Sequence, residues 1–286
     1  MFAVAGASGR IGSMVTDGLI KRGQKVRALV RSAEKGEGLT QKRAEVVVVD
    51  LLDTDALTKA LTGVTGAFLF LPTPPPDQDF FAANEKMVTS LSTAVKRAKL
   101  QTVVFLSSIG AQHPAGTGPI VALHHAEKAL AGSAKSVTFL RAASPLEIWG
   151  PVLLDAIDTG KLPFFGNPHA AFPQVGAKDV GDAAAHALEE HIAGTRVVEV
   201  SGIQNWSAED VAVIMTSLLK QPIHAVERPA DEEVAYQEHL GLVPARAALM
   251  AERSKANARG LLTFSHPHEV RRGTTPLFDA LGPLVA

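Results

Sequence analysis

The sequence of 286 residues contains no cysteine, which excludes disulfide bonds, thiolate metal sites and cysteine nucleophiles. It also lacks an excess of either charge, because 28 Lys and Arg residues stand against 29 Asp and Glu residues. A strongly basic surface is typical of nucleic-acid binding, so we expect no direct nucleic-acid partner. No apolar run approaches the roughly 18 residues of a membrane helix, and Met1 leads into the strand-like MFAVAGA without the basic segment of a signal peptide. We therefore expect a cytoplasmic protein without a membrane partner.

Strand-like and helical segments alternate over the first half of the chain. Runs such as VVVVD and TVVFLS are apolar without alternation, which is typical of parallel strands buried on both faces. Helical spacing of apolar residues predicts a helix after the first strand and further helices over Asp53–Leu61 and Glu85–Ala98. The predicted strands are Phe2–Ala5, Lys25–Arg31, Glu45–Asp50, Ala67–Leu71, Thr102–Ser107, Val137–Leu140 and Val197–Ser201. This order predicts an α/β fold with a doubly wound parallel sheet of the Rossmann type.

The pattern changes after residue 140, where prolines interrupt the chain repeatedly. We expect loops over residues 142–175 around one short helix, Pro151–Thr159, and a later helix over Ser207–Lys220. Two domains follow from this change. Residues 1–141 and about 176–203 would form the nucleotide-binding domain, and residues 142–175 and 204–286 a smaller, mostly helical domain.

A glycine-rich segment, GASGRIG over residues 6–12, separates the first strand from an amphipathic helix. Glycine reaches positive φ and lets a pyrophosphate approach the backbone, and the free N–H groups of a helix start attract phosphate. A strand before and a helix after the glycines favour a dinucleotide site, and a tight turn without a ligand is the alternative. The predicted cofactor-binding residues of this segment are Gly6, Ser8, Gly9, Arg10, Ile11 and Gly12.

The end of the second predicted strand indicates which dinucleotide binds. NAD sites place Asp or Glu there to bind the ribose 2′-hydroxyl, whereas this chain has Arg31. A guanidinium can hold a 2′-phosphate that a carboxylate would repel, and Arg10 and Lys35 could add positive charge. The pattern favours NADP(H) as cofactor, and an arginine that is merely exposed is the alternative.

With these segments in place, the chain resembles the NmrA-like family of atypical short-chain dehydrogenases/reductases over nearly its full length. The resemblance rests on AGASGRIG, KVRALVR, VVVVDLLDTDAL, TVVFLSSIGA and TFLRAA, and on two later patterns, Lys178–Ala184 and Trp206–Ala212. It implies a Rossmann sheet with a small C-terminal domain that roofs a cleft over the nicotinamide. Members of the family include NADPH-dependent quinone oxidoreductases and co-regulators that bind dinucleotide without known catalysis.

The resemblance also implies roles for residues that follow the third and fourth strands. Asp50 and Leu51 would lie against the adenine, since Asp50 is the first residue beyond the carboxyl end of a parallel strand. Asp53 is an alternative helix cap at this point. Beside the diphosphate and ribose we expect Leu71, Pro72 and Thr73.

The chain has a single tyrosine, Tyr236, far from the helix where dehydrogenases and epimerases of the superfamily carry a Tyr-x-x-x-Lys pair. The absence of that pair argues against a sugar epimerase or an ordinary alcohol dehydrogenase. The corresponding segment contains His124 and Lys128 on one helix face, and an imidazole could donate a proton near neutral pH. His125 could take the place of His124, and a helix face with His, Glu and Lys in water is the alternative.

Ser107 ends the fifth strand and could bind the substrate or the nicotinamide amide, or only cap the strand. The candidate catalytic residues are therefore His124, Lys128 and Ser107, and Ser107 is also a candidate cofactor ligand. Histidines without carboxylate or thiolate partners at ligand spacing predict no metal site. Phe80, Phe81, Phe164, Phe165 and Trp149 could line a pocket or belong to the core.

Two functions agree with these residues. The first is an NADPH-dependent reductase of a small conjugated acceptor such as a quinone or enone, for which the chain would orient two rings without a Tyr–Lys pair. The second is a non-catalytic NADP(H) sensor that acts through protein partners. We predict the enzyme, acting on a small molecule as a monomer or homodimer.

Overall fold

The computed structural model describes residues 1–266 and 268–285, which form two compact units. The first unit comprises Met1–Ser108, Ala122–Arg141 and Ala177–Glu199. The second comprises Ile109–Val121, Ala142–Gly176 and the chain from Val200 onward. These units are groups of residues in mutual contact, and the predicted domain limits stay a prediction.

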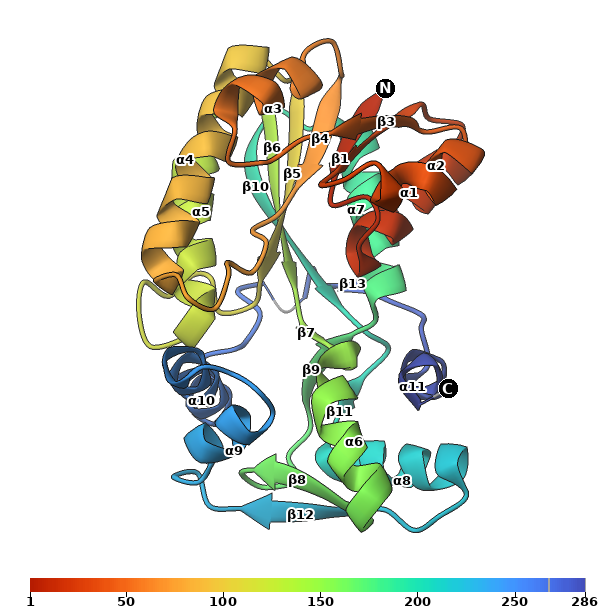
Figure 1. Ribbon diagram of the computed structural model, residues 1–286, viewed down its shortest axis with the longest axis vertical. Helices are drawn as coiled ribbons and strands as arrows, with labels where there is room; N and C mark the ends of the chain where they lie inside the picture. The colour runs from red at the N-terminus through yellow and green to blue at the C-terminus, as the bar shows by residue number, and fades with distance from the viewer. Residues whose placement is uncertain (267, 286) are drawn as a thin grey trace. The chain divides into compact units, whose positions relative to one another are not determined.

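The first unit is built on a parallel sheet, as its apolar strand sequences predict. Its strands lie in the order β10-β6-β5-β4-β1-β2-β3 (Figure 1). Their bounds are β1 Phe2–Ala5, β2 Val26–Val30, β3 Glu45–Val48, β4 Gly66–Leu69, β5 Thr102–Ser108, β6 Ser136–Ala142 and β10 Gly194–Ser201. The strand order reverses at β1, which pairs in parallel with β2 on one side and β4 on the other. Open α/β sheets bind their ligands at the carboxyl ends of the strands beside such a reversal.

Helices cover both faces of this sheet. Figure 1 shows α3 (Thr54–Leu61), α4 (Phe80–Ala98) and α5 (Val121–Leu130) on one face, with α1 (Arg10–Lys21), α2 (Glu37–Gln41) and α7 (Ala177–Glu190) on the other. This confirms the predicted α/β fold with a doubly wound, mostly parallel sheet.

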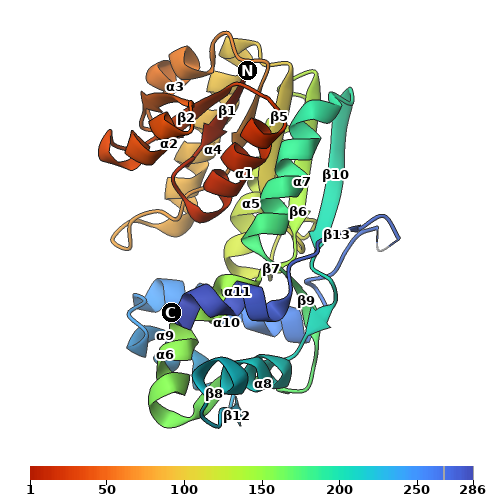
Figure 2. The same ribbon diagram turned by 90° about the vertical axis from the view of Figure 1, so that its right-hand side faces the viewer.

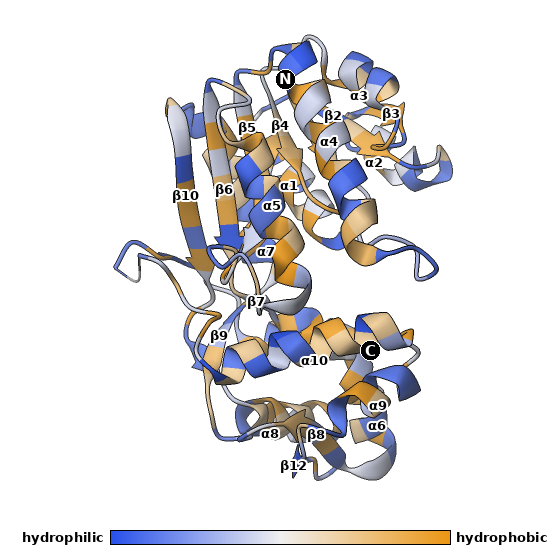
Figure 3. Ribbon diagram, turned by 90° about the vertical axis from the view of Figure 1, so that its left-hand side faces the viewer, coloured by the Kyte–Doolittle hydropathy of each residue, from blue (hydrophilic) through white to orange (hydrophobic). Residues whose placement is uncertain are grey.

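One core cluster of the first unit lies between the sheet and α3, α4 and α5. Figure 3 shows apolar residues along β5 and β6, and Phe105 and Phe139 from these strands meet edge to face with ring centroids 6.4 Å apart. Leu57 and Leu91 from the covering helices are fully buried in the same cluster. Each fully buried side chain of this kind contributes about 1.5–3 kcal/mol, so the sheet is a rigid support for the loops at its carboxyl edge.

Two glycines let α1 pack closely against α7, and Figure 2 shows these helices side by side. A Cβ atom on Gly181 would lie 2.3 Å from the Cβ of Met14, and one on Gly18 would lie 3.1 Å from the Cβ of Ala185. Real side chains are not found at the first of these distances. The sequence therefore fixes the position of α1, the helix that starts at the glycine-rich segment.

The second unit combines short strands with helices. Its elements are η2 Gly118–Ile120, β7 Ser144–Pro145, η3 Leu146–Trp149, α6 Gly150–Thr159, β8 Lys161–Phe165, β9 Phe172–Val175, β11 Asn205–Trp206, α8 Ala208–Leu219, β12 His224–Arg228, α9 Glu233–His239, α10 Pro244–Ala258, β13 Arg271–Arg272 and α11 Leu277–Val285. The prediction of loops around one helix over residues 142–175 is wrong in part, because β8 and β9 lie there. Pro163 lies in β8, and the two-stranded sheet β8–β12 has only edge strands, where proline is tolerated. Pro173 lies in β9, the middle strand of the sheet β11-β9-β7, and the edge-strand explanation does not apply to it.

Aromatic residues pack against one another at the largely aliphatic core of the second unit. Trp149 stacks on Phe164 with ring centroids 6.0 Å apart, and Phe164 stacks on Phe172 at 6.3 Å. The indole N–H of Trp149 donates to Oε1 of Gln174 at 2.7 Å. Trp149 is thus a core residue, whereas Phe164 is half-buried and packs against the same core. Within the described ranges, no helix is both long and apolar enough to cross a membrane.

Candidate functional site

The glycine-rich turn follows β1 directly. Gly6 has a φ of 61°, and a Cβ atom there would lie 2.7 Å from the ring of Phe70. A Cβ atom on Gly12 would lie 2.1 Å from the carbonyl oxygen of Gly6, so the first turn of α1 rests against the loop. Both positions require glycine, which explains the spacing seen in the sequence.

The start of α1 has the character of an anion site. Its N-cap is Gly9, which offers no capping side chain, and the first turn holds no acidic residue. The N–H groups of that turn therefore point outward without a side-chain acceptor at the cap, at the positive end of the helix dipole. Ser8 and Arg10 are exposed beside this turn and Ile11 is half-buried.

Arg31 is the first residue after β2, and it is exposed. It makes no ion pair with any residue in the described part of the chain, whereas Arg27 within the strand donates to Glu45 at 2.9 Å. Lys35 is exposed in η1 (Glu34–Gly36) directly downstream. The residue that follows β2 is thus an exposed arginine in place of an acidic residue, as the sequence predicts.

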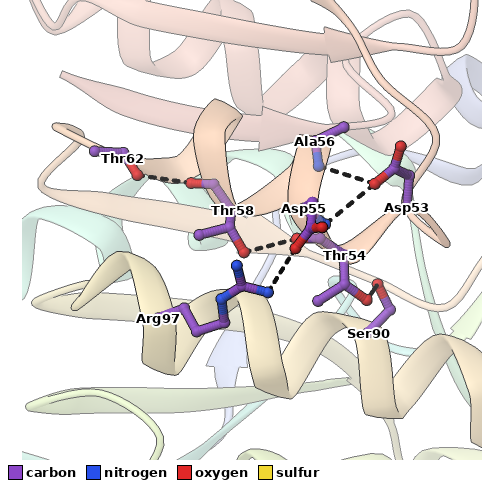
Figure 4. Close-up of polar contacts among 8 residues, drawn as sticks. All are labelled: Asp53, Thr54, Asp55, Ala56, Thr58, Thr62, Ser90 and Arg97. Carbon is purple, nitrogen blue, oxygen red and sulfur yellow. Dashed lines mark hydrogen bonds and ion pairs between the residues drawn. The ribbon is translucent and has the colours of Figure 1, made fainter.

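The turn after β3 is stabilised by local hydrogen bonds. Asp53 caps α3 by accepting from the N–H groups of Asp55 and Ala56 at 3.1 and 2.9 Å, so it is a helix cap (Figure 4). Asp50 is exposed and accepts from the N–H of Leu52 at 2.9 Å, which leaves its second carboxylate oxygen for a ligand. The adenine contact of Asp50 stays a prediction.

Helix α4 anchors the same turn from the side. The Ser90 hydroxyl donates to the Leu51 carbonyl at 2.6 Å and receives a hydrogen bond from Thr54 at 3.1 Å. Arg97 donates to Asp55 at 2.7 Å (Figure 4). Leu51 is therefore held in place, half-buried, at the carboxyl edge of the sheet. Along the loop after β4, Leu71 and Pro72 are also half-buried and Thr73 is exposed.

A buried polar cluster lies where β5, α5 and β6 meet. The Ser107 hydroxyl donates to Oε1 of Glu127 at 2.6 Å. Arg141 donates to the same oxygen through Nε at 2.9 Å and to Oε2 through Nη2 at 2.6 Å. Their exposed fractions are only 3%, 7% and 8% in chain order, so this ion pair is largely shielded from water. We call this group the Ser107–Glu127–Arg141 cluster.

The other residues predicted on α5 lie differently. His124 is half-buried, His125 and Lys128 are exposed, and the two imidazole centroids are 5.7 Å apart. Glu127 is buried, so a helix face wholly in water is wrong for this residue. The catalytic roles of His124 and Lys128 stay predictions.

Sequence reasoning missed Glu127 and Arg141 as members of the site. The signal was present, because Arg141 lies in the otherwise apolar strand sequence TFLRAA. A charge inside a buried strand requires a partner, and a glutamate on the preceding helix is the nearest candidate along the chain.

The single tyrosine has a structural partner in the second unit. The Tyr236 hydroxyl donates to Oδ2 of Asp155 at 2.6 Å. Burial, that hydrogen bond and the charge of Asp155 all raise the pKa of the phenol. A tyrosine that serves as an acid near neutral pH needs the opposite shift, so Tyr236 does not replace the missing Tyr–Lys pair.

A search of the described ranges finds no group of three or more His, Cys, Asp or Glu residues placed to hold a metal ion. The site is instead a glycine-rich turn and a helix start beside the strand reversal of a parallel sheet. These features define a dinucleotide-binding protein of the Rossmann class.

Comparison with known proteins identifies the family. Residues 6–191, more than half of the chain, match the family described as NAD(P)H-binding, and the chain belongs to this family. It is 25% identical to quinone oxidoreductase 2 of Escherichia coli over 274 residues, 91% of this chain and 89% of that protein. It is 26% identical to the NAD(P)H azoreductase of Xenophilus azovorans over 257 residues, 88% of this chain and 85% of that one.

A solved structure shares the fold over the whole length. It is the NADPH-dependent quinone oxidoreductase of Escherichia coli complexed with NADPH, with a TM-score of 0.83, 23% identity and full coverage of both chains. These findings confirm the resemblance to the NmrA-like atypical short-chain reductases.

Proposed function

We propose that this protein is an NADPH-dependent reductase of a small conjugated acceptor, such as a quinone or an enone. Its relatives include a quinone oxidoreductase and an azoreductase, whose names denote reduction of conjugated molecules. The observation that carries the proposal is the unobstructed anion site at the start of α1, together with Arg31 in the place of an acidic residue.

Arg31 supports NADPH over NADH. Its guanidinium is exposed and free of carboxylate partners in the described ranges, so it could donate two hydrogen bonds to a 2′-phosphate. NADH lacks that phosphate and would gain little from the same side chain.

The missing Tyr–Lys pair limits the substrates. When bound, NADPH would supply a hydride, which carries both electrons of the reduction, and the reduced acceptor would then take a proton. A quinone or enone gives a stabilised oxyanion, which can take its proton from water or from a half-buried imidazole such as His124. The task of the chain is then to hold the two reactants in contact rather than to supply a strong acid. No contact described above favours the sensor alternative.

Titration of the wild type and Arg31→Glu with NADPH and with NADH tests the cofactor assignment. We expect the wild type to bind NADPH more tightly, and Arg31→Glu to lose about tenfold or more in NADPH affinity, since two charge-assisted hydrogen bonds are replaced by repulsion. Its NADH affinity should change little. Lys21→Glu, at the far end of α1, is the control with the same charge change. Equal affinities of the wild type for both dinucleotides would contradict the role of Arg31.

A panel of quinones, enones and saturated ketones, followed by the loss of NADPH absorbance, tests the reaction. We expect turnover with the conjugated acceptors, little with the ketones, and less than about a tenfold loss in His124→Ala, because water can replace a weakly required acid. Tight NADPH binding without turnover of any acceptor would instead favour the non-catalytic sensor.

A further inference from the structure

The Ser107–Glu127–Arg141 cluster has a fixed hydrogen-bond direction. The guanidinium of Arg141 donates to both oxygens of Glu127, an arrangement that requires a carboxylate acceptor. A carboxylate has no proton to give, so the 2.6 Å contact with Ser107 uses the single proton of the serine hydroxyl. Ser107 is left with lone pairs only, and any further partner of its oxygen must be a donor.

The place of Ser107 in the sheet suggests that donor. The strand order reverses at β1, which divides the sheet into two halves. One half contains β1, β2 and β3, and the other contains β4 and β5. In doubly wound sheets a dinucleotide lies across the reversal, with one nucleotide over each half. Arg31, at the end of β2, would bind the 2′-phosphate of the adenosine, so the adenosine would lie over the half that contains β2. The nicotinamide would then lie over the half that contains β5. Its carboxamide NH₂ group is a hydrogen-bond donor.

We propose that Glu127 and Arg141 fix Ser107 as the hydrogen-bond acceptor for the carboxamide N–H of the nicotinamide. Ser107 then contacts the cofactor, and Glu127 and Arg141 are positioning residues that act through it. The proposal rests on the proposed NADPH site. It also means that Ser107 does not protonate the reduced acceptor, because its proton is already committed to Glu127.

A cofactor analogue without the N–H donor tests this directly. In the 3-acetylpyridine analogue of NADPH, a methyl group replaces the carboxamide NH₂. We expect the wild type to bind NADPH about five- to tenfold more tightly than the analogue, the effect of one hydrogen bond. Ser107→Ala should lose this preference by weakening NADPH binding while leaving the affinity for the analogue unchanged. Calorimetric titration of both ligands measures the four affinities.

Three further variants separate positioning from folding. Ser107→Thr keeps the hydroxyl and should keep the preference for NADPH. Glu127→Gln is nearly isosteric but replaces one carboxylate oxygen with an NH₂ group, which cannot accept from Arg141. The two-point contact that positions Ser107 is then lost, so we expect the preference to fall. Ser136→Ala removes another buried serine, at the end of β6 opposite to Arg141. This variant should keep the preference for NADPH. Thermal unfolding of each variant confirms that the comparison is made on folded protein.

The possible failures are distinct. If the wild type binds NADPH but Ser107→Ala lowers the affinity for both ligands equally, Ser107 is not the carboxamide acceptor. The proposed reductase function then still stands. The same holds if the wild type shows no preference between the two ligands. If the wild type binds neither ligand, the proposed function fails and this inference fails with it.

Discussion

Two buried glutamates, one in each unit, each accept a hydrogen bond from a serine, but they differ in how an arginine interacts with them. Glu127 in the first unit and Glu233 in the second each accept a 2.6 Å hydrogen bond from a serine hydroxyl, Ser107 and Ser254 respectively. Arg141 donates directly to both oxygens of Glu127. Arg253 affects Glu233 only through its charge, and its buried Nε atom has no hydrogen-bond partner among the residues described.

The comparison shows what direct contact with a guanidinium accomplishes. Burial raises the pKa of Glu233, and the hydrogen bond from Ser254 and the charge of Arg253 offset this only in part. Burial likewise lowers the pKa of Arg253. Glu127 instead has its lone pairs occupied by a guanidinium held in two-point contact, which defines the direction of every hydrogen bond in its cluster. Proximity of charges alone does not give that directionality.

The largest expected effect is that of Arg141→Met. This change leaves the Glu127 carboxylate buried without its cation, so we expect a loss of about 3–5 kcal/mol in the free energy of unfolding, measured in urea. The double variant Glu127→Leu/Arg141→Met removes both charges and should recover most of that loss. A single variant as stable as the wild type would show that the contact contributes no net stability.

Arg253→Met should have a much smaller effect, about 1 kcal/mol or less in the same assay. The change removes a charge that has no direct bond to Glu233, and it also removes the cost of burying the guanidinium. Arg259→Met, an exposed change just after α10, gives the baseline. If Arg253→Met proved as damaging as Arg141→Met, the distinction between the two glutamates would be lost.

The smallest effect is a change in the pH dependence of stability at Glu233. Its pKa is raised above the ordinary 4.5, so the folded protein binds this proton more tightly than the unfolded chain does. Stability therefore falls as pH increases from about that ordinary value through the raised value, and Glu233→Gln removes this contribution. Melting temperatures across pH should show the variant gaining on the wild type as pH increases. Glu238→Gln, exposed on the same helix, should follow the wild type.

Much of the first unit could be predicted from the sequence because its signals are local. The apolar run TVVFLSS predicts a buried parallel strand from its own residues. Gly6 and Gly12 are each explained by a close contact within or beside the turn that leaves no room for a side chain. The position of Asp53 before a helical pattern predicts a possible helix cap, and the structure confirms it. Strands, tight turns and helix caps of this kind can therefore be predicted from a few neighbouring residues.

The remaining features depend on contacts between distant residues. Glu127 and Arg141 are 14 positions apart, and only the packing of α5 on the sheet brings them together. β8 and β12 pair across some 60 residues, which a local reading of Pro163 cannot anticipate. The domain limits, the cytoplasmic location, the oligomeric state and the roles of individual site residues stay predictions.

Gly181 is far along the chain from the glycine-rich turn, yet it limits where the helix that follows that turn can lie. The space beside it is filled by Met14, so even an added methyl group would push α1 outward. Because Gly9 is the N-cap of α1, any such displacement would move the N–H groups that we propose to bind the diphosphate. The affinity for the proposed cofactor should therefore depend on a residue of α7, the helix that packs against α1, as well as on the residues of the turn itself.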